Sequence, residues 1–202
     1  MPKKVFVLKG DSSSYYEPYR SFGPEERDFG QLVSNPSDIG LVVFCGGTDI
    51  TPALYGETPW TGKKDFAYRY DLERDMKEVL AFKIARTMGI PISGICRGAQ
   101  FLYAMFGGKL RQDIRGHTGT QHYTTTRTHG SILTTSDHHQ NPDIRYKPDN
   151  IDITAWAPIG PSETSVEAFE GDKVVAFQFH PEWSSKDSPE WAYAQDRIST
   201  LF

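Results

Sequence analysis

The chain has 202 residues, of which 38% are hydrophobic and 24% charged, and its formal net charge is −4. This composition is typical of a folded protein and excludes a disordered tail, while the absence of any run of Lys or Arg argues against nucleic-acid binding. The N-terminal apolar run is too short for a signal peptide or a membrane span, so we expect a single domain over residues 1–202, no membrane partner and a cytoplasmic location.

Two short apolar runs in the first quarter of the chain are typical of central strands in a parallel sheet. One is KVFVLKG at residues 4–10, and the other is the buried run from Leu41 to Phe44, which two glycines end. The polar, aromatic segment between them predicts loop with one short helix. Tyr15 to Arg20 within it is interpreted as ordinary loop, with a lid or a partner surface as the alternatives.

A helical period begins at Asp71, which can cap the helix, and ends at Gly89. The apolar residues of one face predict core packing for that face: Met76, Val79, Leu80, Ile84 and Met88. A strand at 90–95 and a second helix from Arg97 through Ala104 follow. This alternation predicts an α/β fold, with a doubly wound, mostly parallel central sheet flanked by helices.

The last third of the chain differs from the first two. Residues 117–146 are rich in His, Thr and Asp without clear periodicity, which predicts loops near a functional face. Three short β-type runs follow, DITAWA, TSVEAFE and DKVVAFQF, and predict a small antiparallel portion at the edge of the main sheet or beside it. The tail predicts an amphipathic helix with Trp191, Ile198 and Leu201 docked on the sheet.

The stretch GICRGAQ at 94–100 places Cys96 between two glycines, directly between a strand and a helix. In G-x-C-x-G the first glycine lets the strand turn and the second leaves room for the helix, so the cysteine sits at the tip of a nucleophile elbow. The N-terminus of the following helix then stabilises a thiolate. By itself the motif is also typical of a buried structural thiol.

A base, its orienting group and oxyanion donors are present at the ends of other predicted strands. His180 ends the strand in FQFHPEW, and Glu182, two residues on, can point the same way and fix its tautomer. Gly46 and Gly47 follow a strand with unobstructed N–H groups, and the N–H of Arg97 is the natural second donor for an oxyanion. Cys96 and His180 both lie at strand ends, where α/β folds place their sites, and this favours catalysis over the structural interpretation.

The remaining cysteine and histidines are assigned plainer roles. Cys45 is interpreted as a small buried residue, with a disulfide to Cys96 as a minor alternative. Five histidines crowd one region, at positions 117, 122, 129, 138 and 139. Their spacings match no compact ligand pair, so we predict loop histidines around a substrate pocket and no metal or other cofactor.

Together these motifs resemble the class I, or triad, glutamine amidotransferases, and most closely their γ-glutamyl hydrolase branch, which includes γ-glutamyl-GABA hydrolases. The resemblance extends through GGTDITPALYGE at 46–57, RDMKE at 74–78, GICRGAQ at 94–100, GGKLRQDI at 107–114, SDHHQ at 136–140 and HPE at 180–182. It implies the flavodoxin-like fold of the class I glutaminases.

The resemblance also implies roles for individual residues. It makes Cys96 the nucleophile, His180 the general base and acid, and Glu182 its orienter, with Gly47 and Arg97 as oxyanion donors. It further implies substrate contacts for Gly46, Gln100, Ser136, Asp137 and His138. An asparagine is expected at position 135, directly before Ser136, in the γ-glutamyl hydrolase branch, and this chain has threonine there.

Three functional hypotheses follow. The leading one is a glutaminase that cleaves the γ-amide of L-glutamine through a Cys γ-glutamyl thioester and supplies ammonia to a separate synthase. The second is a stand-alone hydrolase of γ-glutamyl amides such as γ-glutamyl-GABA. The third is a non-catalytic scaffold of the same fold.

Overall fold

The computed structural model describes residues 2–8, 10, 12–58, 70–160 and 162–202. Its main sheet has nine strands in the order β2-β1-β3-β4-β11-β10-β9-β6-β7. Their bounds are Glu25–Glu26 (β2), Lys4–Val7 (β1), Ile39–Phe44 (β3), Ile92–Ile95 (β4), Val174–Phe177 (β11), Thr164–Gly171 (β10), Ile151–Pro158 (β9), Thr120–Thr126 (β6) and Gly130–Ser136 (β7). Leu110–Arg111 (β5) and Asn141–Pro142 (β8) form a separate antiparallel pair.

The sheet has a parallel and an antiparallel half, which meet at β11. Strands β2, β1, β3, β4 and β11 are parallel, and β11, β10, β9, β6 and β7 pair antiparallel in turn. The predicted fold class, a doubly wound sheet with an antiparallel portion, is thus confirmed. The first predicted strand proved shorter than KVFVLKG, and Lys9 of that run lies outside the described residues.

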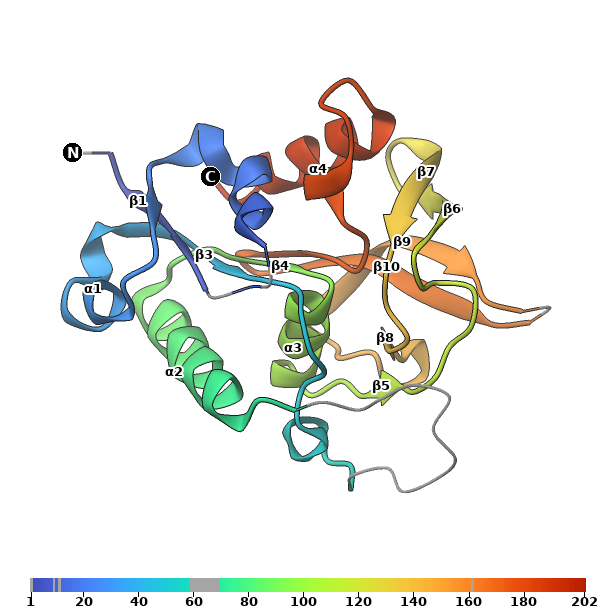
Figure 1. Cartoon of the computed structure of the whole chain (residues 1–202), viewed down its shortest axis with the longest axis horizontal. Helices are drawn as coiled ribbons and strands as arrows, with labels where there is room; N and C mark the ends of the chain where they lie inside the picture. Colours follow the sequence, from blue (N-terminus) through green and yellow to red (C-terminus); the bar gives the residue numbers. More distant parts are fainter. Residues whose placement is uncertain (1, 9, 11, 59–69, 161) are drawn as a thin grey trace.

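Helices cover both faces of the sheet (Figure 1). On one face lie α1 (Phe29–Ser34), α2 (Leu72–Met88) and α3 (Arg97–Met105), and on the other lie the 3₁₀ helix η1 (Ser13–Phe22) and α4 (Pro189–Ser199). Short 3₁₀ turns are found at Pro36–Asp38, Pro52–Tyr55, Ile144–Tyr146 and Pro181–Trp183. Each face has its own buried apolar cluster, so the parallel strands are covered on both sides. Among the described helices, none has both the length and the apolar character needed to cross a membrane.

Helix α2 has the predicted ends but not the predicted buried face. Asp71 accepts a hydrogen bond from the N–H of Arg74, and Gly89 ends the helix with a φ of 64°. The predicted core stripe is largely wrong, because Met76, Leu80 and Met88 are exposed, although Val79 and Ile84 pack partly against the core. The buried residues of α2 are Asp75, Glu78, Ala81 and Ala85. Two small alanines allow close approach to the sheet, and the two carboxylates are buried because a buried cation, described below, pairs with them.

The structure corrects two expectations for the last third of the chain. Much of the region 117–146, expected to be loop, forms the hairpin β6–β7, whose inward side chains include Thr124, Thr126 and Thr134, and so carry no hydrophobic period. The three later runs do pair antiparallel with one another, but β11 also pairs in parallel with β4, so it lies inside the main sheet rather than at its edge. The predicted tail helix is α4, with Ile198 buried and Leu201 packed beside it.

Candidate functional site

The strand-to-helix turn at Cys96 has the strained geometry that its two glycines predict. Cys96 has φ 52° and ψ −110°, in the region that residues with a Cβ rarely adopt, and it directly precedes the first turn of α3. A Cβ on Gly94 would lie 2.7 Å from the backbone of Gly98, and a Cβ on Gly98 would lie 2.0 Å from the carbonyl oxygen of Phe44. Only glycine fits at either position, so the sequence holds the thiol at the tip of the turn.

The predicted base lies on the strand next to the predicted nucleophile. The N–H of Cys96 donates to the carbonyl of Phe177 at 2.7 Å, and His180 is three residues beyond Phe177, past the end of β11. Nδ1 of His180 donates to Oε1 of Glu182 at 2.7 Å, which leaves Nε2 for the sulfur. Both residues are buried. The alignment of β4 with β11 therefore brings together the three residues that the sequence predicted.

The charges around His180 favour its protonated form. Burial by itself lowers the pKa of this imidazole, but the negative charges of Cys96 and Glu182 outweigh burial and raise the pKa of His180 to about 10. The ring also stacks on Trp183, with 3.7 Å between centroids and 3° between planes. At neutral pH the arrangement is therefore that of an imidazolium held flat by Trp183 beside the sulfur of Cys96.

The predicted oxyanion glycines and Cys96 follow two neighbouring parallel strands. β3 and β4 are paired in register, with Phe44 opposite Gly94, so the glycine loop and the turn at Cys96 both leave the same edge of the sheet. Gly47 has a φ of 132°. The guanidinium of Arg74 donates to the carbonyl oxygens of Cys45 and Gly46 at 2.9 and 2.8 Å. Those two carbonyls are thereby fixed, and the peptide orientation of the glycine loop is fixed with them.

Beneath the turn, a buried ion network connects α2 to the residue that follows the predicted nucleophile. The guanidinium of Arg97 donates to the carboxylates of Asp75 and Glu78, and all three side chains are 1% exposed. Glu78 also accepts from Arg74 at 2.9 Å, and Asp75 accepts from the N–H of Thr51. One network therefore anchors both the first residue of α3 and the glycine loop.

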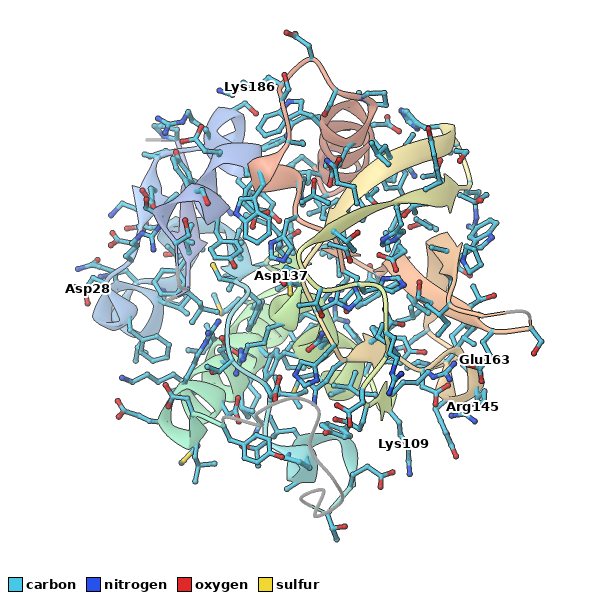
Figure 2. All side chains as sticks on the ribbon, turned by 45° about the vertical axis from the view of Figure 1, so that its right-hand side comes forward. Asp28, Lys109, Asp137, Arg145, Glu163 and Lys186 are labelled. Atoms are coloured by element: carbon cyan, nitrogen blue, oxygen red, sulfur yellow. The ribbon has the colours of Figure 1, made fainter. Side chains whose placement is uncertain are left out.

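The predicted substrate residues of the segment 136–140 are placed differently from one another. The backbone oxygen of Asp137 is 3.8 Å from the sulfur of Cys96, while its exposed carboxylate accepts from the N–H of Gly119. Asp137 is labelled near the middle of the face shown in Figure 2. Ser136 is buried, and its hydroxyl has no hydrogen-bond partner among the described residues.

The side chains of Gln100 and His138 are engaged within the protein. Nε2 of Gln100 donates to the carbonyl of Gln140 at 2.9 Å and to Oε1 of Gln178 at 3.3 Å. Nδ1 of His138 donates to the same carbonyl of Gln140 at 2.8 Å, and burial lowers the pKa of His138 to about 3. His138 is therefore a neutral imidazole with its proton on Nδ1.

The sequence analysis missed several residues around the site. Tyr15 lies within the segment interpreted as loop, yet it is buried, its ring is 6.4 Å from that of His180, and its hydroxyl occupies the space that a side chain on Gly46 would need. Asp75 and Glu78 were missed because carboxylates are rarely buried. An arginine directly after the cysteine, in an otherwise apolar turn, was the signal that buried acids must exist.

The two cysteines are expected to differ sharply in reactivity. Cys45 is fully buried, its thiol donates to the carbonyl of Leu8 at 3.0 Å, and burial raises its pKa. We expect iodoacetamide to alkylate Cys96 well before Cys45 in the native protein, as read by peptide mass spectrometry over time. Labelling of Cys45 first would mean that Cys96 is not the reactive thiol. Unfolded protein, in which both sites should react alike, is the control.

A buried carboxylate near the triad gives a testable pH dependence of stability. Glu190 accepts from the N–H of Thr135 at 3.1 Å, and burial raises the pKa of Glu190 from 4.5 to about 7. The folded state therefore binds this proton more tightly than the unfolded state, so stability falls between about pH 4.5 and pH 7. Glu190→Gln should remove about 3 kcal/mol of that fall, measured by urea unfolding at each pH. Parallel curves for the two proteins would contradict the assignment.

Comparison with known proteins identifies a family model and relatives whose sequences match this chain. A model of the peptidase C26 family matches residues 24–134. The glutamine amidotransferase-like protein YvdE of Lactococcus lactis is 32% identical over 163 residues, which cover 71% of this chain and 66% of that protein. The carbamoyl phosphate synthase small chain of Thermoplasma volcanium is 34% identical over 112 residues, 54% of this chain and 30% of that one.

The fold is shared with solved structures. A glutamine amidotransferase from Thermotoga maritima superposes with a TM-score of 0.64 at 15% identity, over 100% of this chain and 90% of that one. The chain spans just under two thirds of YvdE and less than a third of the carbamoyl phosphate synthase small chain.

Proposed function

Because the chain belongs to the peptidase C26 family and its relatives include glutamine amidotransferase-like proteins, we propose that it hydrolyses the γ-amide of L-glutamine and supplies the ammonia to a separate synthase. The observation that carries the proposal is Cys96 at a strained turn before α3, with His180 and Glu182 on the adjoining strand end. The match to a carbamoyl phosphate synthase small chain supports the synthase as partner.

In the proposed reaction the Cys96 thiolate attacks the γ-carbonyl carbon of glutamine. The N–H groups of Gly47 and Arg97 stabilise the resulting oxyanion, and His180 gives its Nε2 proton to the amide nitrogen. Ammonia leaves, and the γ-glutamyl group stays on sulfur as a thioester. A water molecule then attacks the thioester, His180 accepts its proton, and glutamate is released with the thiolate restored.

Substrate contacts belong to the same proposal. Gly46, Gln100, Ser136, Asp137 and His138 are assigned to the glutamyl pocket by resemblance. The backbone of Asp137 beside Cys96 supports a role for this segment. For Gln100 and His138, whose side chains bond to Gln140, the proposed role is to shape the pocket wall.

The test is to incubate the purified protein separately with L-glutamine and with γ-glutamyl-GABA, and to follow glutamate release. The Cys96→Ala variant is the control. Weak, Cys96-dependent release from glutamine that a synthase strengthens is the expected result. Strong release from γ-glutamyl-GABA alone would favour a self-sufficient hydrolase. Failure to hydrolyse either compound, together with a biological activity that survives Cys96→Ala, would favour a scaffold.

The order of effects within the triad tests the roles of His180 and Glu182. Glu182→Gln should lower kcat/KM less than His180→Ala, because an orienting group contributes less than the proton carrier. Glu182→Gln should also move the alkaline limb of the pH profile below its expected position near pH 10, since Glu182 helps to raise the pKa of His180. A larger fall in kcat/KM for Glu182→Gln than for His180→Ala would contradict these roles. So would an alkaline limb at the same pH in Glu182→Gln and in the parent protein.

A further inference from the structure

A second cluster of ligand-type side chains lies outside the triad, in the antiparallel half of the sheet. It consists of His117, His122 on β6, His138 after β7, and Glu167 on β10. Nδ1 of His117 and Nε2 of His122 are each 3.6 Å from Oε1 of Glu167. The rings of His117 and His138 are 5.0 Å apart, and the ligand atoms of His117, His138 and Glu167 all lie within 4.8 Å of one another.

The cluster is buried, and several of its polar atoms have no hydrogen-bond partner. His117, His138 and Glu167 are 3%, 5% and 0% exposed, and His122 is mostly covered. Among the described residues, no hydrogen bond satisfies Nδ1 of His117, Nε2 of His138, either ring nitrogen of His122, or Oε2 of Glu167. Buried polar atoms in folded proteins are nearly always partnered, and ligand atoms of His117, His138 and Glu167 converge within 4.8 Å, so these residues are placed to share one ligand.

The surroundings orient these side chains as metal ligands are oriented. The carbonyl of Gln140 holds the proton of His138 on Nδ1, which leaves the lone pair on Nε2. The hydroxyl of Ser165 donates to Oε1 of Glu167 at 2.5 Å.

We propose that His117, His122, His138 and Glu167 bind one divalent transition-metal ion of the zinc class. Imidazole nitrogen and carboxylate oxygen are ligands that Zn²⁺ prefers, and structural zinc sites are closed and four-coordinate. With bonds of about 2.0–2.1 Å, the ligand atoms of a tetrahedral site lie about 3.4 Å apart. The two separations of 3.6 Å are already close to that value. The ligand atoms of His117, His138 and Glu167 already lie together, and a side-chain movement of His122 would complete the shell.

The ion would brace the segment beside the predicted nucleophile rather than take part in the reaction. His138 directly follows Asp137, whose backbone oxygen faces the Cys96 sulfur. The N–H of His138 also donates to the carbonyl of His117 at 2.9 Å, so two of the ligands are already linked through the backbone. The ion would join β6, β10 and the segment 136–140 at one point. The sequence analysis predicted no metal because its criterion was ligand spacing along the chain, whereas these ligands converge from separate strands.

The test uses metal content as its readout, in a Cys96→Ala background so that the catalytic thiol cannot bind the metal. The protein is stripped with a chelator, equilibrated with Zn²⁺ or Co²⁺, and desalted. We expect about one equivalent of metal per chain by mass spectrometry and a higher melting temperature than the stripped protein. Co²⁺ should give the visible d–d bands of a four-coordinate nitrogen and oxygen site, without a sulfur charge-transfer band.

Ligand variants locate the ion, with a histidine of the same hairpin as the matched control. His122→Ala and Glu167→Gln should each weaken Zn²⁺ binding at least tenfold, while His129→Ala, which lies in the β6–β7 turn outside the cluster, should bind as the parent does. Absence of bound metal and of any thermal shift in the Cys96→Ala protein would overturn the proposal. Equal binding by the His122 variant and the parent would also overturn it. The Co²⁺ spectrum of the Cys96→Ala protein itself tests the proposal even where a ligand variant fails to fold.

Discussion

Replacing Cys96 with serine is expected to lower kcat/KM for glutamate release by about 10⁴- to 10⁶-fold. Serine matches cysteine in shape, so the turn and its neighbours stay in place, but at neutral pH its hydroxyl is not ionised by a neighbouring imidazolium. The attacking sulfur anion of the proposed mechanism is therefore lost. Coupled detection of glutamate, with enzyme in excess to reach the low rates, measures the fall.

The other cysteine provides the matched control for this prediction. Cys45→Ala also removes one thiol, but that thiol is directed at the carbonyl of Leu8 and away from the turn. We expect it to lower kcat/KM by less than tenfold. Unfolding curves should show the serine variant within about 1 kcal/mol of the parent, because the exchange nearly conserves volume. Turnover at the parental rate by Cys96→Ser would show that another group makes the attack.

Replacing Arg97 with methionine is expected to destabilise the fold by about 3–5 kcal/mol, the usual cost of leaving buried charges without their partner. Arg97 is 1% exposed and pairs with both Asp75 and Glu78, so methionine fills similar space but leaves a net negative charge under the turn. The carboxylate of Glu78 also holds Arg74, which holds the glycine loop, so glutamate release should fall as well.

Urea unfolding at pH 7 measures this loss of stability. An exposed ion pair on α2, the helix that carries Asp75 and Glu78, provides the control. Lys77→Met breaks the exposed ion pair with Glu73 and should cost far less stability than Arg97→Met, because solvent screens exposed charges. Combining Arg97→Met with Asp75→Leu should recover part of the lost stability, since one of the stranded charges is removed with its partner. Equal costs for Arg97→Met and Lys77→Met would mean that the buried network contributes little.

Local patterns in the sequence predicted the parallel half of the fold well. The strands at 39–44 and 92–95 were recognisable from the apolar runs at 41–44 and 90–95, α2 from its cap and period, and α3 from its place directly after the turn at Cys96. The antiparallel half was harder, because the inward residues of the β6–β7 hairpin are threonines and serine apart from Ile132. Long-range pairing, such as β11 beside β4, has no local signal at all.

The candidate site likewise has residues that local motifs predicted and residues that only the three-dimensional structure shows. Cys96, His180 and Glu182 were predicted from motifs within a few residues, and the structure brings their side chains together. The choice of buried face on α2 could not be predicted from apolar residues, since Asp75 and Glu78 are buried only because Arg97 lies opposite them. Clusters assembled from distant strands, such as that around Glu167, became visible only in three dimensions.

The place of β11 in the sheet affects how the chain matures during synthesis. β11 comes from residues 174–177 but lies between β4 and β10, so β4 keeps an open hydrogen-bonding edge until that late segment has left the ribosome. His180 and Glu182 follow β11 in the same segment. A growing chain therefore carries its thiol without the imidazolium that activates it. The segment that closes the sheet is therefore also the one that completes the proposed triad, so a chain that lacks it exposes a strand edge and, under the proposed mechanism, is inert.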